Sequence, residues 1–66
     1  RGALKTALAQ LPEEDRTVIV LRDLEGLSNK DAADVLGVEL AALKSRLHRA
    51  RLKLLAVLRR EDRHGT

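Results

Sequence analysis

The sequence contains no cysteine, which excludes both a disulfide framework and a metal site built on thiolates. A chain without cysteine fits a reducing compartment, so we expect a cytoplasmic protein. Phenylalanine, tyrosine and tryptophan are also absent, and no aromatic ring is available to stack on unpaired bases. If the chain binds nucleic acid, double-stranded DNA is therefore the expected form.

Long apolar runs and clusters of catalytic residues are missing as well. No run approaches the roughly 18 residues of a membrane span, and no signal-peptide pattern is present. The two histidines stand far apart, the charged neighbours of His48 are all cations, and His64 lies in a polar tail. We therefore expect no membrane insertion, no metal, no cofactor and no enzymatic activity, with an inert His64. The start at Arg1 suggests a piece of a longer protein.

The charge is distributed unevenly along the chain. Residues 1–43 carry five basic and eight acidic side chains, whereas residues 44–66 carry eight basic and two acidic ones. A domain with these halves on different faces has one surface that attracts anions, and a regularly charged polyanion is the obvious ligand.

The basic charge concentrates in residues 40–60, which hold seven Lys or Arg residues and no carboxylate. At 100° per residue, one side of this helix is apolar. That stripe comprises Leu40, Leu43, Leu47, Ala50, Leu54 and Leu58. The opposite side presents small or basic residues: Ala41, Ala42, Ser45, His48 and Arg49, flanked by Lys44 and Arg46. Such a helix suits the major groove of DNA, although a solvated basic face would give a similar pattern.

Two shorter helices are expected in the first third of the chain. Residues 3–11 have an inner face of Leu4, Ala7, Leu8 and Leu11. Pro12 ends this helix and suits the first turn of the next, where three exposed carboxylates, Glu13, Glu14 and Asp15, complement the helix dipole. Residues 17–21 (TVIVL) are rich in β-branched side chains, which are typical of a strand. The flanking signals nevertheless favour a helix of about 13 residues that ends at a left-handed Gly26.

A helix-turn-helix is predicted from residue 28 onwards. Ser28 is the expected N-cap of the third helix, with Asp31 three residues later, and Gly37 is the expected C-cap. The packing face should comprise Ala32, Ala33, Val35 and Leu36. The fold class is therefore all-α: one four-helix domain over residues 1–66, in which a helix-turn-helix ends in a long recognition helix. We expect the tail, residues 61–66, to be disordered.

Residues 11–54 resemble region 4, the C-terminal domain of bacterial extracytoplasmic-function (ECF) sigma factors of the sigma-70 family. The most specific pieces are LPEEDR at 11–16, LEGLS at 24–28 and LKSRLHRAR at 43–51. The resemblance implies recognition of the −35 promoter element as part of RNA polymerase holoenzyme. It also implies a separate domain for the −10 element, which this chain does not contain, so the chain should not initiate transcription alone.

Carried over by position, the DNA contacts of the family fall on Lys44, Ser45, His48 and Arg49. Arg46 and Arg51 would lie nearer the DNA backbone or form internal ion pairs. The chain departs from the family pattern at 39–42, where a common Gly-Thr is replaced by two alanines and Glu39 adds a carboxylate.

Two other functions remain open. Sigma factors of this group are held inactive by anti-sigma factors, and Leu52, Leu55 and Ala56 lie outside the apolar stripe as an edge for such a partner. The chain could act chiefly as that interaction module. Alternatively, it could be the helix-turn-helix domain of a response regulator, which shares the motif but not LPEEDR or SRLHRAR in this form.

Overall fold

The computed structural model describes residues 2–64, and the side chains of residues 2–60. Its elements are helix α1 (Gly2–Ala9), α2 (Glu13–Ile19), the π-helical turn η1 (Val20–Leu24), α3 (Asn29–Leu36) and α4 (Leu40–His64). Within this described part there is no strand, so the predicted all-α class is confirmed. The helix, rather than a strand, at residues 17–21 is confirmed as well.

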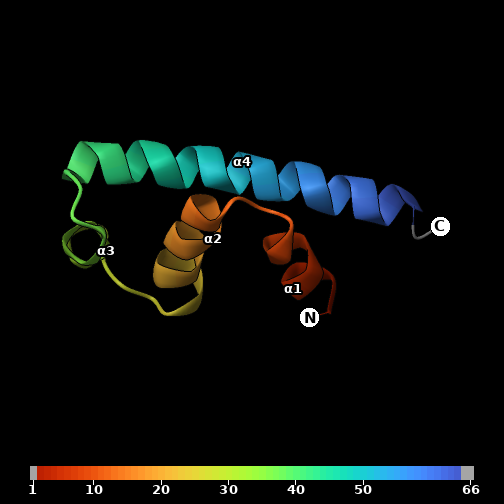
Figure 1. The fold of residues 1–66 in the computed structure, drawn as a ribbon, viewed down its shortest axis with the longest axis horizontal. Helices are drawn as coiled ribbons and strands as arrows, with labels where there is room; N and C mark the ends of the chain where they lie inside the picture. Colours follow the sequence, from red (N-terminus) through yellow and green to blue (C-terminus); the bar gives the residue numbers. More distant parts are fainter. Residues whose placement is uncertain (1, 65–66) are drawn as a thin grey trace.

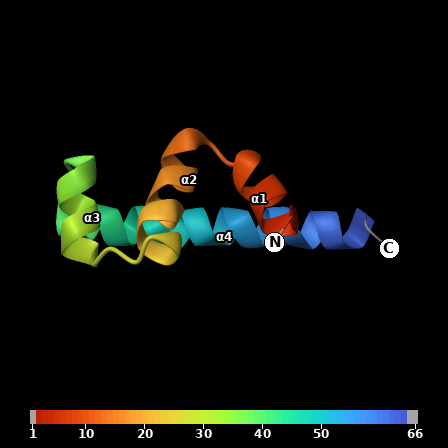
Figure 2. The ribbon, with the colours of Figure 1, turned by 90° about the horizontal axis from the view of Figure 1, so that it is seen from below.

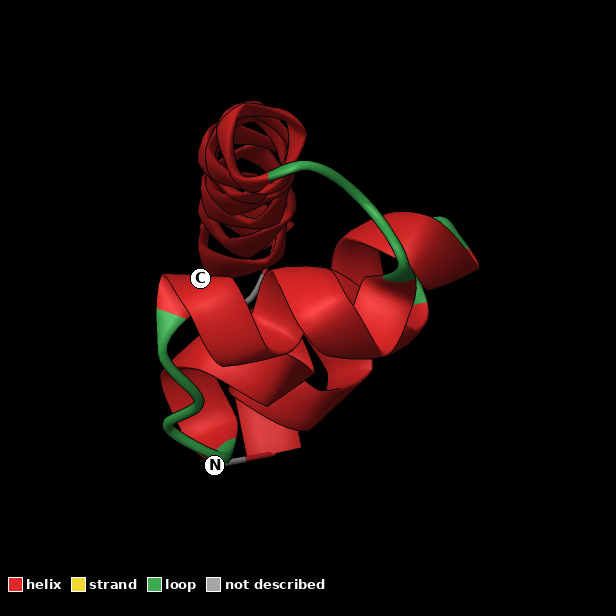
Figure 3. Ribbon diagram, turned by 90° about the vertical axis from the view of Figure 1, so that its left-hand side faces the viewer, coloured by secondary structure: helices red, strands yellow, loops and turns green. Residues whose placement is uncertain are grey.

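Helix α4 sets the shape of the molecule. At about 1.5 Å per residue, its 25 residues account for nearly all of the 40 Å long axis. The shorter helices α1, α2 and α3 lie along one side of it (Figure 1). Seen end-on, α4 lies on one side of the layer that they form, and the rest of its circumference is left open (Figure 3). This arrangement leaves one long helix face free to meet a partner.

The core lies between α4 and the shorter helices. The predicted inner positions Leu43, Leu47 and Ala50 are buried, and Leu54 and Leu58 pack against the core while partly exposed. Leu40 is 45% exposed, so its assignment to the stripe is wrong, while Val57 is buried although it was not assigned. Periodicity shows which side of a helix faces inward, but not how far along the helix its neighbours extend.

The first three helices largely follow the predicted pattern. Ala7, Leu8 and Leu11 are buried, whereas Leu4 is 37% exposed at the rim. In α3, Ala32 and Ala33 are buried and Leu36 is partly so. Val35, which we expected to pack inward, is 64% exposed. An eight-residue helix that covers only one end of α4 buries a narrow stripe, and Val35 falls outside it.

Two helix ends differ from the prediction. The second helix does not remain α-helical, because its last turn widens into η1 before Gly26, whose φ of +77° is the predicted left-handed conformation. Helix α4 continues through residues 61–64, where we expected disorder. Residues 65 and 66, and the side chain of His64, lie outside the described part.

Candidate nucleic-acid interface

The turn between α3 and α4 has the geometry of a helix-turn-helix. The Ser28 hydroxyl accepts a hydrogen bond of 3.0 Å from the Asp31 N–H and so caps α3. At the other end, Gly37 adopts a φ of +67°, and the Val38 N–H donates to the Ala33 carbonyl at 3.0 Å. This 6→1 bond is that of a Schellman motif, which stops the helix and turns the chain sharply. The predicted caps are therefore confirmed, and they set the path from α3 into α4.

The predicted DNA-contacting residues gather on the outward side of the first half of α4. Lys44, Ser45, His48 and Arg49 are exposed, while Arg46 is half-buried at the flank of the helix. These side chains lie within residues 44–49, less than two turns of one helix, so the helix holds them in fixed positions relative to one another. The structure thus brings the predicted set together, and a groove about 12 Å wide admits such a helix.

Arg51, the sixth predicted contact, is held by Asp23 of η1. Its Nε donates to one carboxylate oxygen at 3.0 Å, and its Nη2 lies 2.5 Å from the other. These hydrogen bonds from Arg51 lower the pKa of Asp23 below its usual range, against the opposing effect of partial burial. The carboxylate raises the pKa of Arg51 in turn. Of the two roles that the resemblance left to Arg51, the internal ion pair is therefore the one that the structure contains.

A second ion pair lies on the opposite flank of α4. Lys53 Nζ is 2.8 Å from Asp15 Oδ2, and Asp15 is buried, with only 7% of its surface exposed. Our expectation of an exposed Asp15 in the first turn of α2 is wrong, because this turn packs against α4. Lys53 and Arg51 are two residues apart and point about 200° apart on the helix, so the segment from α2 to η1 crosses beneath α4 and is held on both flanks (Figure 2).

Arg22 fixes the approach to α3. Its Nη1 donates to the Leu27 carbonyl at 2.6 Å, and its Nε donates to Asn29 Oδ1 at 2.5 Å. The side chain therefore ties η1 to the first residue of α3 and braces the loop between them. No short-range pattern in the sequence indicates these two acceptors for Arg22.

The predicted partner-binding edge is exposed. Leu52 and Leu55 are 54% and 44% exposed, and Ala56 is also open to solvent. Leu52 follows His48 by one turn, so the edge continues the outward side of α4 beyond the basic residues. Apolar and basic surfaces are thus neighbours along a single helix face.

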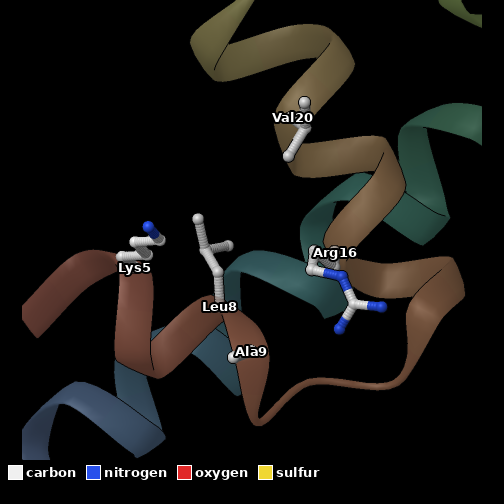
Figure 4. A pocket seen from close by; sticks show the side chains of 5 residues that line it. All are labelled: Lys5, Leu8, Ala9, Arg16 and Val20. Atoms are coloured by element: carbon white, nitrogen blue, oxygen red, sulfur yellow. The ribbon is translucent and has the colours of Figure 1, made fainter.

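An open hollow of about 330 Å³ lies between α1 and α2. Its walls are mainly apolar and include Leu8, Ala9 and Val20, and the cations Lys5 and Arg16 also line it (Figure 4). Arg16 Nη1 also donates to the Leu11 carbonyl at 3.1 Å, which braces the link between α1 and α2. No α4 residue lines the hollow, so the hollow is separate from the outward basic face of α4, which comprises Lys44, Ser45, His48 and Arg49.

Two features are absent from the described residues. No group of His, Asp or Glu that could hold a metal ion occurs among them. None of the described helices is long and apolar enough to cross a membrane. His48 lies on the exposed side of α4, where its charged neighbours along the helix are Lys and Arg.

The sequence matches a family model described as Sigma-70, region 4, over residues 1–54. The ECF RNA polymerase sigma factor SigE of Mycolicibacterium smegmatis is 47% identical over 51 residues, which are 77% of this chain and 20% of that protein. EcfG of Rhodopseudomonas palustris is 41% identical over 54 residues, or 82% of this chain and 30% of its own length. SigM of Mycobacterium tuberculosis is 43% identical over 56 residues, with shares of 85% and 29%. The chain thus spans less than a third of these three relatives.

Proposed function

The chain belongs to the sigma-70 region 4 family, and from this premise we propose that it reads the −35 promoter element for an ECF sigma factor. In that role it directs RNA polymerase core to promoters, while another part of the sigma factor acts at the −10 element. The matching relatives carry sigma-factor names, and these matches do not favour a response regulator. We further propose a cytoplasmic domain with no enzymatic activity of its own.

One observation carries this proposal: the capped helix-turn-helix presents the outward basic face of α4 free of other elements. Ser28 and Gly37 hold the ends of α3, and the buried Leu43 and Leu47 hold α4 against the core. Opposite these leucines, Ser45, His48 and Arg49 point away from the domain. A helix fixed along one side and donor-rich along the other can enter a major groove without moving the rest of the fold.

The side chains on this face suggest how bases and phosphates would share it. Lys44 and Arg49 carry donors that match the adjacent N7 and O6 acceptors of guanine, and Ser45 can serve a base edge or a phosphate. Arg46 is half-buried at the flank, where it would meet the DNA backbone. His48 lies between Lys44 and Leu52 on the same side, so it would face the centre of the groove.

The test is a titration of fluorescent promoter duplex at several salt concentrations. Cations that displace condensed counterions give a log–log salt slope of about −0.9 per phosphate contact, so we expect strong weakening of binding with added salt. A scrambled duplex should bind more weakly at each salt concentration. A flat salt dependence would remove the outward face of α4 from the DNA interface.

A second proposal concerns regulation. Leu52, Leu55 and Ala56 form an exposed apolar edge that continues the basic face. We propose that an anti-sigma factor covers this edge together with part of the basic face. Since one surface cannot hold protein and DNA at once, that partner would block promoter recognition.

A further inference from the structure

Asp23 bears on DNA binding although it lies outside α4. It sits in η1, at the flank of α4, and both of its carboxylate oxygens accept hydrogen bonds from Arg51. Arg51 follows Lys44 by seven residues, or two helical turns, which is about 10.5 Å along the axis. Because Arg51 lies on the flank of α4, beside Asp23, a major groove that received the outward side of this helix would bring the DNA backbone close to Arg51.

The pair is electrically neutral as a unit. Electrostatic affinity for DNA comes from the counterions that a protein's cations release. A guanidinium that keeps a carboxylate as its partner adds no net charge, so it releases no counterion when it approaches a phosphate. The same carboxylate also repels the phosphate. Arg51 can therefore contribute a full phosphate contact only if it leaves Asp23.

We infer that Asp23 withholds Arg51 from DNA phosphates and so lowers the affinity of the domain for every DNA sequence. The inference rests on the proposed function. Since a phosphate contact carries no base information, Asp23 sets the general strength of binding, while the preference for the −35 sequence stays with the outward residues of α4. Asp23 is a positioning residue, because it acts through Arg51 and not by touching DNA.

The experiment compares four proteins: wild type, Asp23→Asn, Arg51→Ala and the double variant. Salt slopes are measured on cognate and scrambled duplexes, and elution from a heparin column gives a readout with a polyanion that has no bases. Asp23→Asn frees Arg51, so its slope should steepen by about 0.9. Between 50 and 200 mM salt, that change corresponds to an additional loss of affinity of about threefold to fourfold. The affinity of this variant for both duplexes should rise by the same factor, and the variant should elute later from heparin.

The double variant is the decisive comparison, because it removes a neutral pair. Its slope and its heparin elution should equal those of the wild type. Glu25→Gln is the matched control for charge alone, since Glu25 is exposed two residues beyond Asp23. Removal of this carboxylate should change the slope less than Asp23→Asn does.

Two results would overturn the inference. If Asp23→Asn and Glu25→Gln have equal slopes, Arg51 is not freed. If the double variant has a slope about 0.9 flatter than the wild type, Arg51 already binds a phosphate. If the variants elute from heparin in the expected order but the wild type binds the cognate and scrambled duplexes equally, the result counts against the proposed function and not against this inference. Circular dichroism checks each fold, and Asp23→Ser replaces Asp23→Asn if helicity is lost.

Discussion

Asp15 and Lys53 lie 38 positions apart in the sequence, yet the Lys53 ammonium stands 2.8 Å from an Asp15 carboxylate oxygen. Asp15 is buried in the first turn of α2, whereas the Lys53 side chain remains 53% exposed. The cation is therefore the partner that keeps a buried carboxylate satisfied. Since Asp23 and Arg51 make the corresponding contact on the other flank, the two pairs fix the angle at which α2 and η1 cross α4.

Lys53→Met should destabilise the domain by about 1–3 kcal/mol, because it leaves the buried Asp15 carboxylate without its hydrogen-bonded cation. The aliphatic part of the side chain is kept, so lost packing is not the cause. Urea unfolding followed by circular dichroism measures the change. Lys44→Met is the matched control on the exposed side of the same helix, and its free energy of unfolding should stay within about 0.5 kcal/mol of the wild type. Equal losses for both variants would show that Asp15 does not depend on Lys53.

The N-cap of α3 gives a second stability prediction. Ser28→Ala removes the hydroxyl that accepts from the Asp31 N–H, so it should cost about 1 kcal/mol of unfolding free energy. Ser45→Ala is the control, because Ser45 is exposed within α4 and alanine favours a helix interior. This control should be neutral or slightly stabilising. If Ser28→Ala were equally neutral, the helix-turn-helix would not need its N-cap.

The short-range signals of the sequence predicted most of what surrounds the turn. Ser28, Gly26 and Gly37 act through neighbours a few residues away, so their roles can be read locally. The burial of Asp15 could not be predicted, because it follows from how α2 crosses α4. Negative charge in a first turn ordinarily indicates an exposed helix start, and here the tertiary contact overrides that pattern.

The candidate interface also contains features that the sequence could predict and features that it could not. The exposure of Ser45, His48 and Arg49 follows from helical periodicity, and the structure confirms it. The engagement of Arg51 with Asp23 does not follow from periodicity, since the partner comes from another element 28 positions away. Sequence reasoning allowed Arg51 either an internal pair or a backbone contact, and only the packing of η1 against α4 distinguishes the two.

The Asp23–Arg51 pair should make stability depend on acid pH. Because Arg51 lowers the pKa of Asp23 in the folded state, the folded protein binds fewer protons than the unfolded chain near that pKa. The stabilisation is therefore complete above the unfolded value of about 3.9, and it is lost as the pH falls through the lower folded value. The pair is partly exposed, so its contribution is expected in the range of 0–1 kcal/mol.

This dependence can be measured by urea unfolding of the wild type and Asp23→Asn between pH 7 and pH 2.5. The difference between them should be constant from pH 7 to about pH 5 and should shrink below that. Asp31→Asn provides a control carboxylate in α3, which is exposed. A difference between wild type and Asp23→Asn that does not change on acidification would show that the pair does not form in solution.

We propose that the first half of α4 reads bases, so substitutions there should affect DNA binding differently from substitutions further along the helix. Arg49→Ala and Lys44→Ala should each cost about 1–3 kcal/mol on the cognate duplex and should relax base preference. Arg59 lies more than two turns beyond Arg49, so Arg59→Ala should weaken binding to all DNA sequences alike. Affinities for cognate and scrambled duplexes measure both effects. An unchanged ratio for Arg49→Ala would remove this residue from base reading.

The exposed leucines of α4 should matter for a protein partner and not for the fold. Leu52 and Leu55 lie outside the core, so replacing both with lysine should leave helix content nearly unchanged. The same change should weaken an anti-sigma complex by several kcal/mol, because apolar burial is lost and charge is introduced. DNA binding should survive or strengthen, since two cations are added beside the basic face. Leu47→Lys is the contrasting control, because Leu47 is 5% exposed and a charge there should unfold the domain. If the double variant lost helix content as Leu47→Lys does, the two leucines would belong to the core and the partner edge would have to be abandoned.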